Sequence, residues 1–181
     1  MVHESGFASV LDASLLARAQ RGDVAAFEAI YRCYERPAFG LALRILGRPA
    51  VAEDAVHDAF LRAFEKLGSY RGDAPFGAWM KRLVANAAID RLRSEQRWEG
   101  DDEQVELLDA AGTSDADLVE AQGLLARLPA RARSVVWLHE MEGYSHAEIA
   151  ALFRQSESWS KSVLARSLER LRRQLEEEAP A

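Results

Sequence analysis

The chain has 181 residues, of which 49% are hydrophobic and 29% charged, and its formal net charge is −6 at pH 7. This length accommodates one ordinary domain or two small ones, and the composition is that of a soluble globular protein. There is no apolar run of about eighteen residues, no basic segment at the N-terminus and only one cysteine, Cys33, so the sequence argues against a transmembrane helix, a secretion signal and an internal disulfide, and favours a reducing cytosol.

The acidic residues are concentrated in one stretch. Between Glu95 and Glu120 there are ten acids and a single basic residue, Arg97. The parts of the chain on either side are therefore mildly basic, and the overall charge says little about whether they bind nucleic acid.

Apolar periodicity predicts helices in nearly every part of the chain and no strand, which indicates an all-α fold. Asp12 is expected to cap the first helix and Gly22 to end it, while Pro37 implies a kink or break in the second. We expect a first domain over residues 10–96 with four helices, at residues 12–21, 23–46, 50–67 and 76–93.

Residues 97–118 are polar and acidic and lack a sustained period, which predicts a flexible linker. A second domain is expected over residues 119–178. After a helical stretch at 119–127, Pro129 opens a helix that runs to Gly143. Ser145 and Glu148 form a capping box for a short helix, and a long basic helix follows.

A short capped helix, a three-residue turn and a longer basic helix are typical of a helix-turn-helix, whose second helix lies in the DNA major groove. Any two packed helices share this periodicity, so the pattern alone leaves DNA binding open. In the long helix, Glu169 is outnumbered by basic residues at Lys161, Arg166, Arg170, Arg172 and Arg173.

Residues 71–93 read RGDAPFGAWMKRLVANAAIDRLR and carry five basic residues against two acids. Cations hold phosphates and aromatic rings stack on unpaired bases, so this segment predicts contact with single-stranded nucleic acid. Phe76 and Trp79 are also spaced as core residues of a helix, and we assign Phe76 to the core.

The chain resembles the extracytoplasmic-function (ECF) group of bacterial RNA polymerase sigma factors. In the first domain the resemblance rests on AFEAIYRCY at 26–34, AEDAVHDAFLRAF at 52–64 and the helix at 76–93. In the second it rests on LLARLPARARSVVWLHEMEGYSHAEIAALF at 124–153 and the basic helix after it. It implies an alternative sigma factor whose region 2 opens the −10 promoter element and whose region 4 reads the −35 element.

The resemblance also implies partners and residues. The partners are the core polymerase, promoter DNA and an anti-sigma factor, in the cytoplasm or held at the membrane by that factor. The clamp coiled coil and the flap of the polymerase are the expected docking sites. The residues expected at the clamp interface are Asp54, His57, Asp58, Phe60 and Leu61. Those expected at the −10 element are Tyr70, Arg71, Trp79, Lys81, Arg82, Asn86, Arg91 and Arg93. Those expected at the −35 element, in a helix-turn-helix over about residues 146–165, are Ser158, Trp159, Lys161, Ser162 and Arg166.

The second domain departs from the family pattern around the turn. Arg154 stands where the family has a glycine, and Ser160 stands where it has a valine. A non-glycine residue in the left-handed conformation costs about 1 kcal/mol. We expect the fold to survive. Trp159 and Val163, one turn apart, are expected to be an exposed pair that contacts either DNA or a protein.

Two other readings stay open. A sigma-like decoy would titrate an anti-sigma factor without binding DNA, although the basic segment at 81–93 argues against it. A conventional helix-turn-helix repressor leaves the first domain unexplained. His139 and His146 lack a third ligand for zinc, and no catalytic set is present, so we expect no metal, no cofactor and no enzymatic activity.

Overall fold

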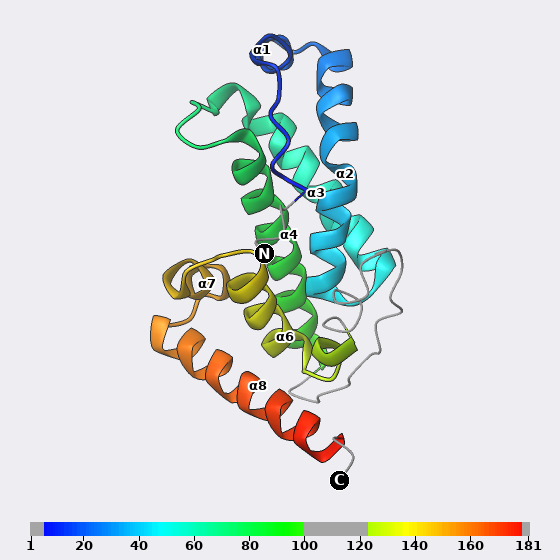
Figure 1. The fold of residues 1–181 in the computed structure, drawn as a ribbon. Helices are drawn as coiled ribbons and strands as arrows, with labels where there is room; N and C mark the ends of the chain where they lie inside the picture. Colours follow the sequence, from blue (N-terminus) through cyan, green and yellow to red (C-terminus); the bar gives the residue numbers. More distant parts are fainter. Residues whose placement is uncertain (1–5, 100–122, 179–181) are drawn as a thin grey trace. The chain divides into compact units, whose positions relative to one another are not determined.

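The computed structural model describes residues 6–99 and 123–178. These residues form helices joined by short turns, and the described part of the chain contains no strand (Figure 1), as the all-α prediction requires. Its contacts divide the chain into two compact units, Met1–Leu43 with Pro49–Arg91 and Arg44–Arg48 with Leu92–Ala181.

The four helices predicted for the first half of the chain are all present. Asp12 caps the first of them by accepting a hydrogen bond of 2.9 Å from the backbone of Ser14, which lowers the pKa of Asp12. Gly22 follows its end with a φ of 88°. The helices are α1 (Ala13–Gln20), α2 (Val24–Leu46), α3 (Pro49–Lys66) and α4 (Phe76–Glu99), with a 3-10 turn at Leu67–Ser69 before the last.

Pro37 does not break α2, which runs on to Leu46. A proline inside a helix removes one backbone hydrogen bond and costs about 3 kcal/mol. Burial on both sides of Pro37 offsets this cost, since Tyr34 and Ala38 are 0% exposed. A Cβ atom added to Gly6 would lie 2.8 Å from the Pro37 ring, so the N-terminal segment packs directly on the proline.

Small residues on α3 shape the core of the first unit. Ala52, Ala55 and Ala59 are each 0% exposed, which lets neighbouring helices approach closely. Tyr34 of α2 is also fully buried, and its hydroxyl donates a 2.7 Å hydrogen bond to the carbonyl of Ser9. Burial raises the pKa of Tyr34 to about 12.

The second unit contains the predicted succession of helices. Residues 123–126 are helical, and α6 (Ala130–Val136) follows Pro129 and continues into a π-helical turn at Trp137–Met141. Helix α7 (His146–Phe153) begins with the predicted capping box, and α8 (Glu157–Glu178) follows. Of the predicted linker, the first residues belong to the end of α4 and the rest lie outside the described residues.

Candidate protein and nucleic-acid interfaces

Helix α3 carries acidic and apolar side chains on its solvent-facing side. Asp54 and His57 are exposed, Asp58 is half-buried and Leu61 is 51% exposed. Phe60 is only 4% exposed, and its ring packs 4.6 Å from that of Tyr31. The Phe60 side chain therefore belongs to the core, behind the exposed residues of this face.

Sequence reasoning missed the aromatic part of this face. Phe64 belongs to the apolar stripe of α3 but is 49% exposed, and its ring meets Phe27 of α2 edge-on at 5.0 Å. Tyr31 and Val24 of α2 are 36% and 71% exposed. Large exposed apolar side chains that gather on one face mark protein docking sites. The period of α3 could not reveal this exposure, because it places Phe64 on the same stripe as the buried Phe60 and Leu67.

Arg91 connects residues that were predicted for two different partners. Its guanidinium lies 2.7 Å from a carboxylate oxygen of Asp58 and 3.5 Å from one of Asp54. A second pair, Arg62 with Asp90 at 3.4 Å, also joins α3 to α4. The structure therefore brings a predicted DNA contact together with two predicted polymerase contacts.

Three aromatic rings cluster at the two ends of the loop at residues 70–75, whose residues 71–75 are exposed. The rings of Tyr70, Phe76 and Trp79 lie 5.2–5.3 Å from one another. Phe76 is 7% exposed, so its assignment to the core is confirmed, while Tyr70 and Trp79 are half-buried. The Tyr70 hydroxyl donates to the carbonyl of Ala74 at 2.6 Å and holds the loop closed.

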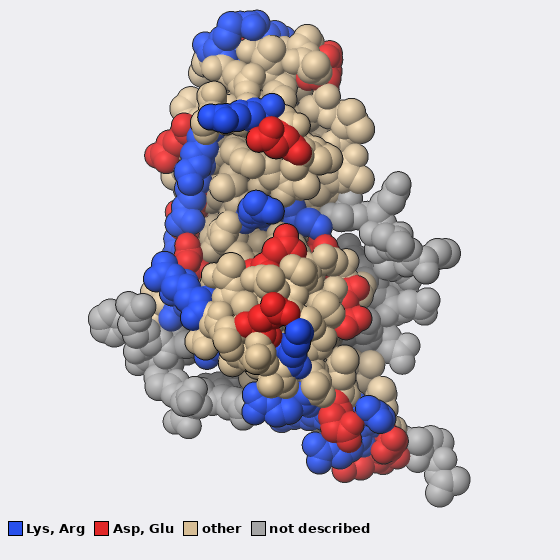
Figure 2. Space-filling model, turned by 90° about the vertical axis from the view of Figure 1, so that its left-hand side faces the viewer, with Lys and Arg blue, Asp and Glu red and all other residues tan. Residues whose placement is uncertain are grey.

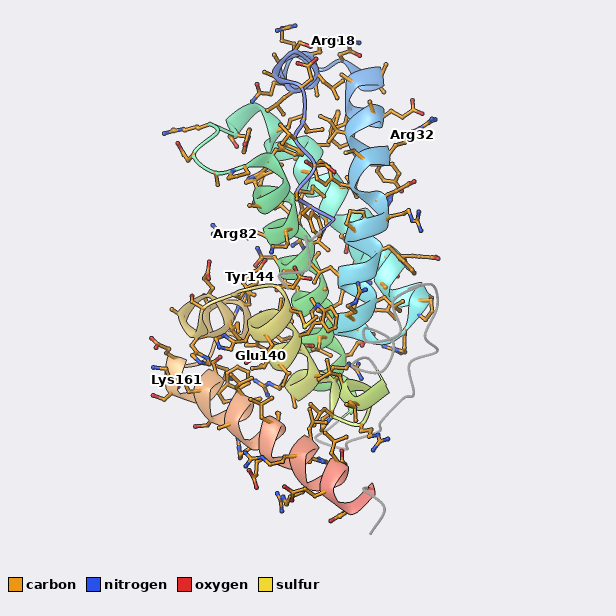
Figure 3. All side chains as sticks on the ribbon, in the orientation of Figure 1. Arg18, Arg32, Arg82, Glu140, Tyr144 and Lys161 are labelled. Atoms are coloured by element: carbon orange, nitrogen blue, oxygen red, sulfur yellow. The ribbon has the colours of Figure 1, made fainter. Side chains whose placement is uncertain are left out.

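Basic residues line α4 after this loop. Arg82 is exposed and points away from the helix (Figure 3), while Lys81, Asn86 and Arg93 are half-buried. Arg71 of the loop is exposed. Figure 2 shows a column of Lys and Arg side chains on the upper body of the molecule. Such a column attracts a phosphate backbone.

The turn of the helix-turn-helix adopts the left-handed backbone that the resemblance implied. Arg154 has φ 53° and ψ 46°, the left-handed conformation. Its N–H donates to the carbonyl of Ala151 at 3.3 Å, and the N–H of Gln155 donates to that of Ala150 at 2.9 Å. These two bonds form a Schellman motif, which normally places glycine at the Arg154 position.

Helix α8 exposes a polar and basic face in its first turns. Lys161 is exposed there (Figure 3), and its ammonium lies 2.7 Å from a carboxylate oxygen of Glu157. Ser158, Ser162 and Arg166 are also exposed, and their spacing of four residues places them on one side of the helix.

Trp159 and Val163 are half-buried, so the prediction that they form an exposed pair is wrong. The Trp159 ring packs 5.2 Å from Phe153 of α7, and the guanidinium of Arg131 lies 4.8 Å from its centre. Trp159 thus fixes α8 on its neighbours. Ser160, which replaces an apolar residue, is 0% exposed.

The buried Ser160 hydroxyl lies 3.0 Å from Nδ1 of His146 and so joins α8 to the start of α7. The His146 ring stacks on that of His139 at 4.3 Å, and His139 Nδ1 donates to the carbonyl of Tyr144 at 2.8 Å.

Among the described residues, no group of three or more His, Cys, Asp and Glu side chains is arranged to hold a metal. None of the described helices is both long and apolar enough to span a bilayer.

Comparisons with known proteins identify two successive regions in the chain. Residues 30–98 match the family model "Sigma-70 region 2", and residues 118–171 match "Sigma-70, region 4". The chain is 36% identical over 166 residues to the ECF RNA polymerase sigma factor SigM of Mycobacterium tuberculosis, which covers 91% of this chain and 84% of that protein. It is 28% identical to the RNA polymerase sigma-H factor of Pseudomonas aeruginosa, over 91% of this chain and 94% of that protein.

Solved structures support the same fold. CnrH in complex with the cytosolic domain of CnrY matches with a TM-score of 0.53 and 25% identity, over 92% of this chain and 97% of that one. The sigma factor RpoE in complex with the anti-sigma factor NepR from Bartonella quintana matches with a TM-score of 0.55 and 21% identity, over 84% of this chain and 98% of that one, which shows the fold alone. The two family models in their order along the chain, together with the 36% identity to SigM, show that this chain belongs to the ECF sigma factors of the sigma-70 family.

Proposed function

We propose that this protein is an alternative sigma factor that docks on core RNA polymerase through its first unit and recognises promoters with both units. One observation carries the proposal: the first unit combines an acidic and apolar face on α3 with an aromatic loop and a basic helix, and a helix-turn-helix follows in the same chain. Neither a repressor nor a simple single-strand binder needs all three features.

The face of α3 is the proposed site for the clamp coiled coil of the largest polymerase subunit. Asp54 and His57 offer polar contacts, and Leu61 adds an exposed apolar side chain. Tyr31 and Phe64 extend this apolar area. An acidic rim steers a basic partner into position, and the desolvated apolar centre supplies the affinity.

The loop at residues 70–75 and helix α4 are the proposed −10 site. Opening a promoter costs roughly 1.4 kcal/mol of stacking for each base-pair step. Capture of unpaired bases beside the rings of Tyr70 and Trp79 offsets part of this cost. Arg71, Lys81 and Arg82 hold the backbone of the displaced strand by charge.

The first turns of α8 are the proposed −35 site. Ser158, Lys161, Ser162 and Arg166 present donors on the exposed face of the helix, and donors at the start of a recognition helix reach base edges in the major groove. Trp159 serves this site indirectly, because its packing on Phe153 sets the orientation of α8.

An anti-sigma factor is the proposed regulator. CnrH and RpoE were each solved in complex, with CnrY and with the anti-sigma factor NepR respectively. The exposed apolar patch of Val24, Tyr31, Leu61 and Phe64 gives such a factor a surface that competes with polymerase. Because its target is the transcription machinery, the protein acts in the cytoplasm, or at the membrane through its anti-sigma factor.

Run-off transcription with purified core polymerase tests this function in the absence of any anti-sigma factor. Promoter-specific transcripts above the level of core alone are the expected result. If no candidate promoter yields them, the proposal fails.

The alternative is a decoy that binds an anti-sigma factor without DNA, and the strained Arg154 and the polar Ser160 in the helix-turn-helix favour it. A pull-down separates the two functions, because a sigma factor retains core polymerase and a decoy does not.

A further inference from the structure

The loop proposed to capture a −10 base is held from outside the segment that matches the region 2 family model, which begins at residue 30. Gln20, the last residue of α1, donates from its side-chain amide to the carbonyl of Tyr70 at 3.0 Å and to that of Leu67 at 3.3 Å. These carbonyls mark the point where the chain leaves α3 and enters the loop. The contact spans 50 residues of sequence.

Residues 6–12 form a strap that is connected to the same loop through aromatic rings. Phe7 is 6% exposed, and its ring lies 6.1 Å from the ring of Tyr34. The Tyr34 hydroxyl donates to Ser9, and its ring lies 5.6 Å from that of Phe76. Phe76 in turn packs 5.3 Å from Tyr70. A continuous row of rings therefore runs from the strap to the loop.

Gly77 allows the strap to take this path. A Cβ atom built on Gly77 would lie 1.8 Å from the carbonyl oxygen of Phe7, a distance that no side chain can tolerate. The strap thus crosses the first turn of α4, directly after the loop, in backbone-to-backbone contact.

We infer that the N-terminal segment is part of the −10 site, with Gln20 and Phe7 as positioning residues that fix the loop in its base-capturing form before DNA arrives. The inference rests on the proposed function. A loop that is ordered before binding loses less conformational entropy when it binds DNA. Removing the contacts that order it should therefore weaken base capture and leave the phosphate contacts unchanged.

The test uses the full chain with core polymerase and a single-stranded −10 oligonucleotide taken from a promoter active in run-off transcription. Each position of the oligonucleotide is replaced in turn by an abasic nucleotide, and the affinity ratio of intact to abasic strand measures base capture. Gln20→Met keeps the side-chain length and removes the donor. Because Gln20 is exposed, the substitution leaves the core of the unit intact.

At the captured position we expect Gln20→Met to lower this ratio roughly fivefold, the effect of one net hydrogen bond. Affinity for core polymerase and the salt dependence of oligonucleotide binding stay at wild-type values. Gly77→Ala, which displaces the strap, lowers the same ratio. Val10→Ala is the matched control. Val10 lies in the strap and is 96% exposed, so this substitution should leave the affinity ratio unchanged.

Unchanged ratios in both Gln20→Met and Gly77→Ala overturn the inference. A loss of base capture accompanied by an equal loss of core affinity also overturns it, because it shows a general structural role. If the wild-type protein binds intact and abasic strands equally well at every position, the proposed −10 function itself fails. If the wild type prefers the intact strand and both variants prefer it to the same extent, only the present inference fails.

Discussion

Replacing Arg154 with glycine is expected to stabilise the second unit. Arg154 is the one non-glycine residue with a positive φ among residues 6–99 and 123–178. In this conformation its Cβ crowds the following carbonyl oxygen, at a cost of about 1–2 kcal/mol. The two Schellman bonds are made by backbone N–H groups, so glycine keeps both of them.

The gain is reduced by the greater freedom of glycine in the unfolded chain, which costs about 0.4–1 kcal/mol. The side chain of Arg154 is exposed, so its removal costs little burial. The free energy of unfolding should therefore rise by about 0.5–1 kcal/mol. For a small domain this corresponds to an increase in Tm of about 2–8 °C.

Arg154→Ala is the control that isolates backbone strain, because alanine removes the side chain and keeps the Cβ atom. Hydrogen exchange of the amides in α7 and α8, measured on the full chain, reports the stability of this unit separately from the first. If the glycine variant exceeds the alanine variant by less than about 0.3 kcal/mol, which is within the scatter of such comparisons, the strain argument is refuted.

Four further outcomes are expected. Leu61→Asp should weaken core polymerase binding at least tenfold in a titration with labelled core. Tm should not change, because Leu61 is 51% exposed. Equal affinity of the variant and the wild type would show that α3 is not part of the interface. Arg82→Ala should reduce the salt slope of promoter binding by about 0.7, the value for one phosphate contact on a single strand, measured by fluorescence anisotropy across a salt series; an unaltered slope would exclude a phosphate contact. Tyr34 has a pKa raised to about 12, so its contribution to stability is complete below pH ~10 and is lost as pH rises toward 12; urea titrations of Tyr34→Phe should show a shallower alkaline decline than wild type. Ser160→Ala should cost about 1 kcal/mol by loss of the bond to His146, and a neutral result in urea unfolding would show that this bond adds nothing.

The features that the sequence predicted correctly are those decided within a few residues. Asp12 caps α1, Ser145 and Glu148 close a capping box, and Arg154 adopts the left-handed turn. The two caps depend on a side chain and backbone groups no more than three positions away, so spacing and residue type suffice to predict them. The left-handed backbone at Arg154 followed only from the resemblance, because the family has a glycine at that position.

Features that depend on distant residues were not predictable in the same way. The period of α3 places Phe60 and Phe64 on the same stripe, and each ring contacts an aromatic ring of α2, yet Phe60 is 4% and Phe64 is 49% exposed. Trp159 is half-buried because Phe153 and Arg131 reach it from other helices. The sequence period describes which residues share a face, and tertiary packing decides how far that face extends.

Arg91 shows why the two predicted surfaces of the first unit cannot be treated as independent. It holds Asp58 at 2.7 Å and Asp54 at 3.5 Å, so a basic polymerase segment that engages these acids competes with Arg91 for them. An arginine displaced from the acids is available to a phosphate, and the converse holds by reciprocity of coupled binding. Partly exposed ion pairs contribute at most about 1 kcal/mol each, so the two pairs limit the coupling to about a thirtyfold effect on affinity. The coupling is positive, because binding of core polymerase to the acids frees Arg91 for DNA, and binding of DNA to Arg91 frees the acids for core polymerase.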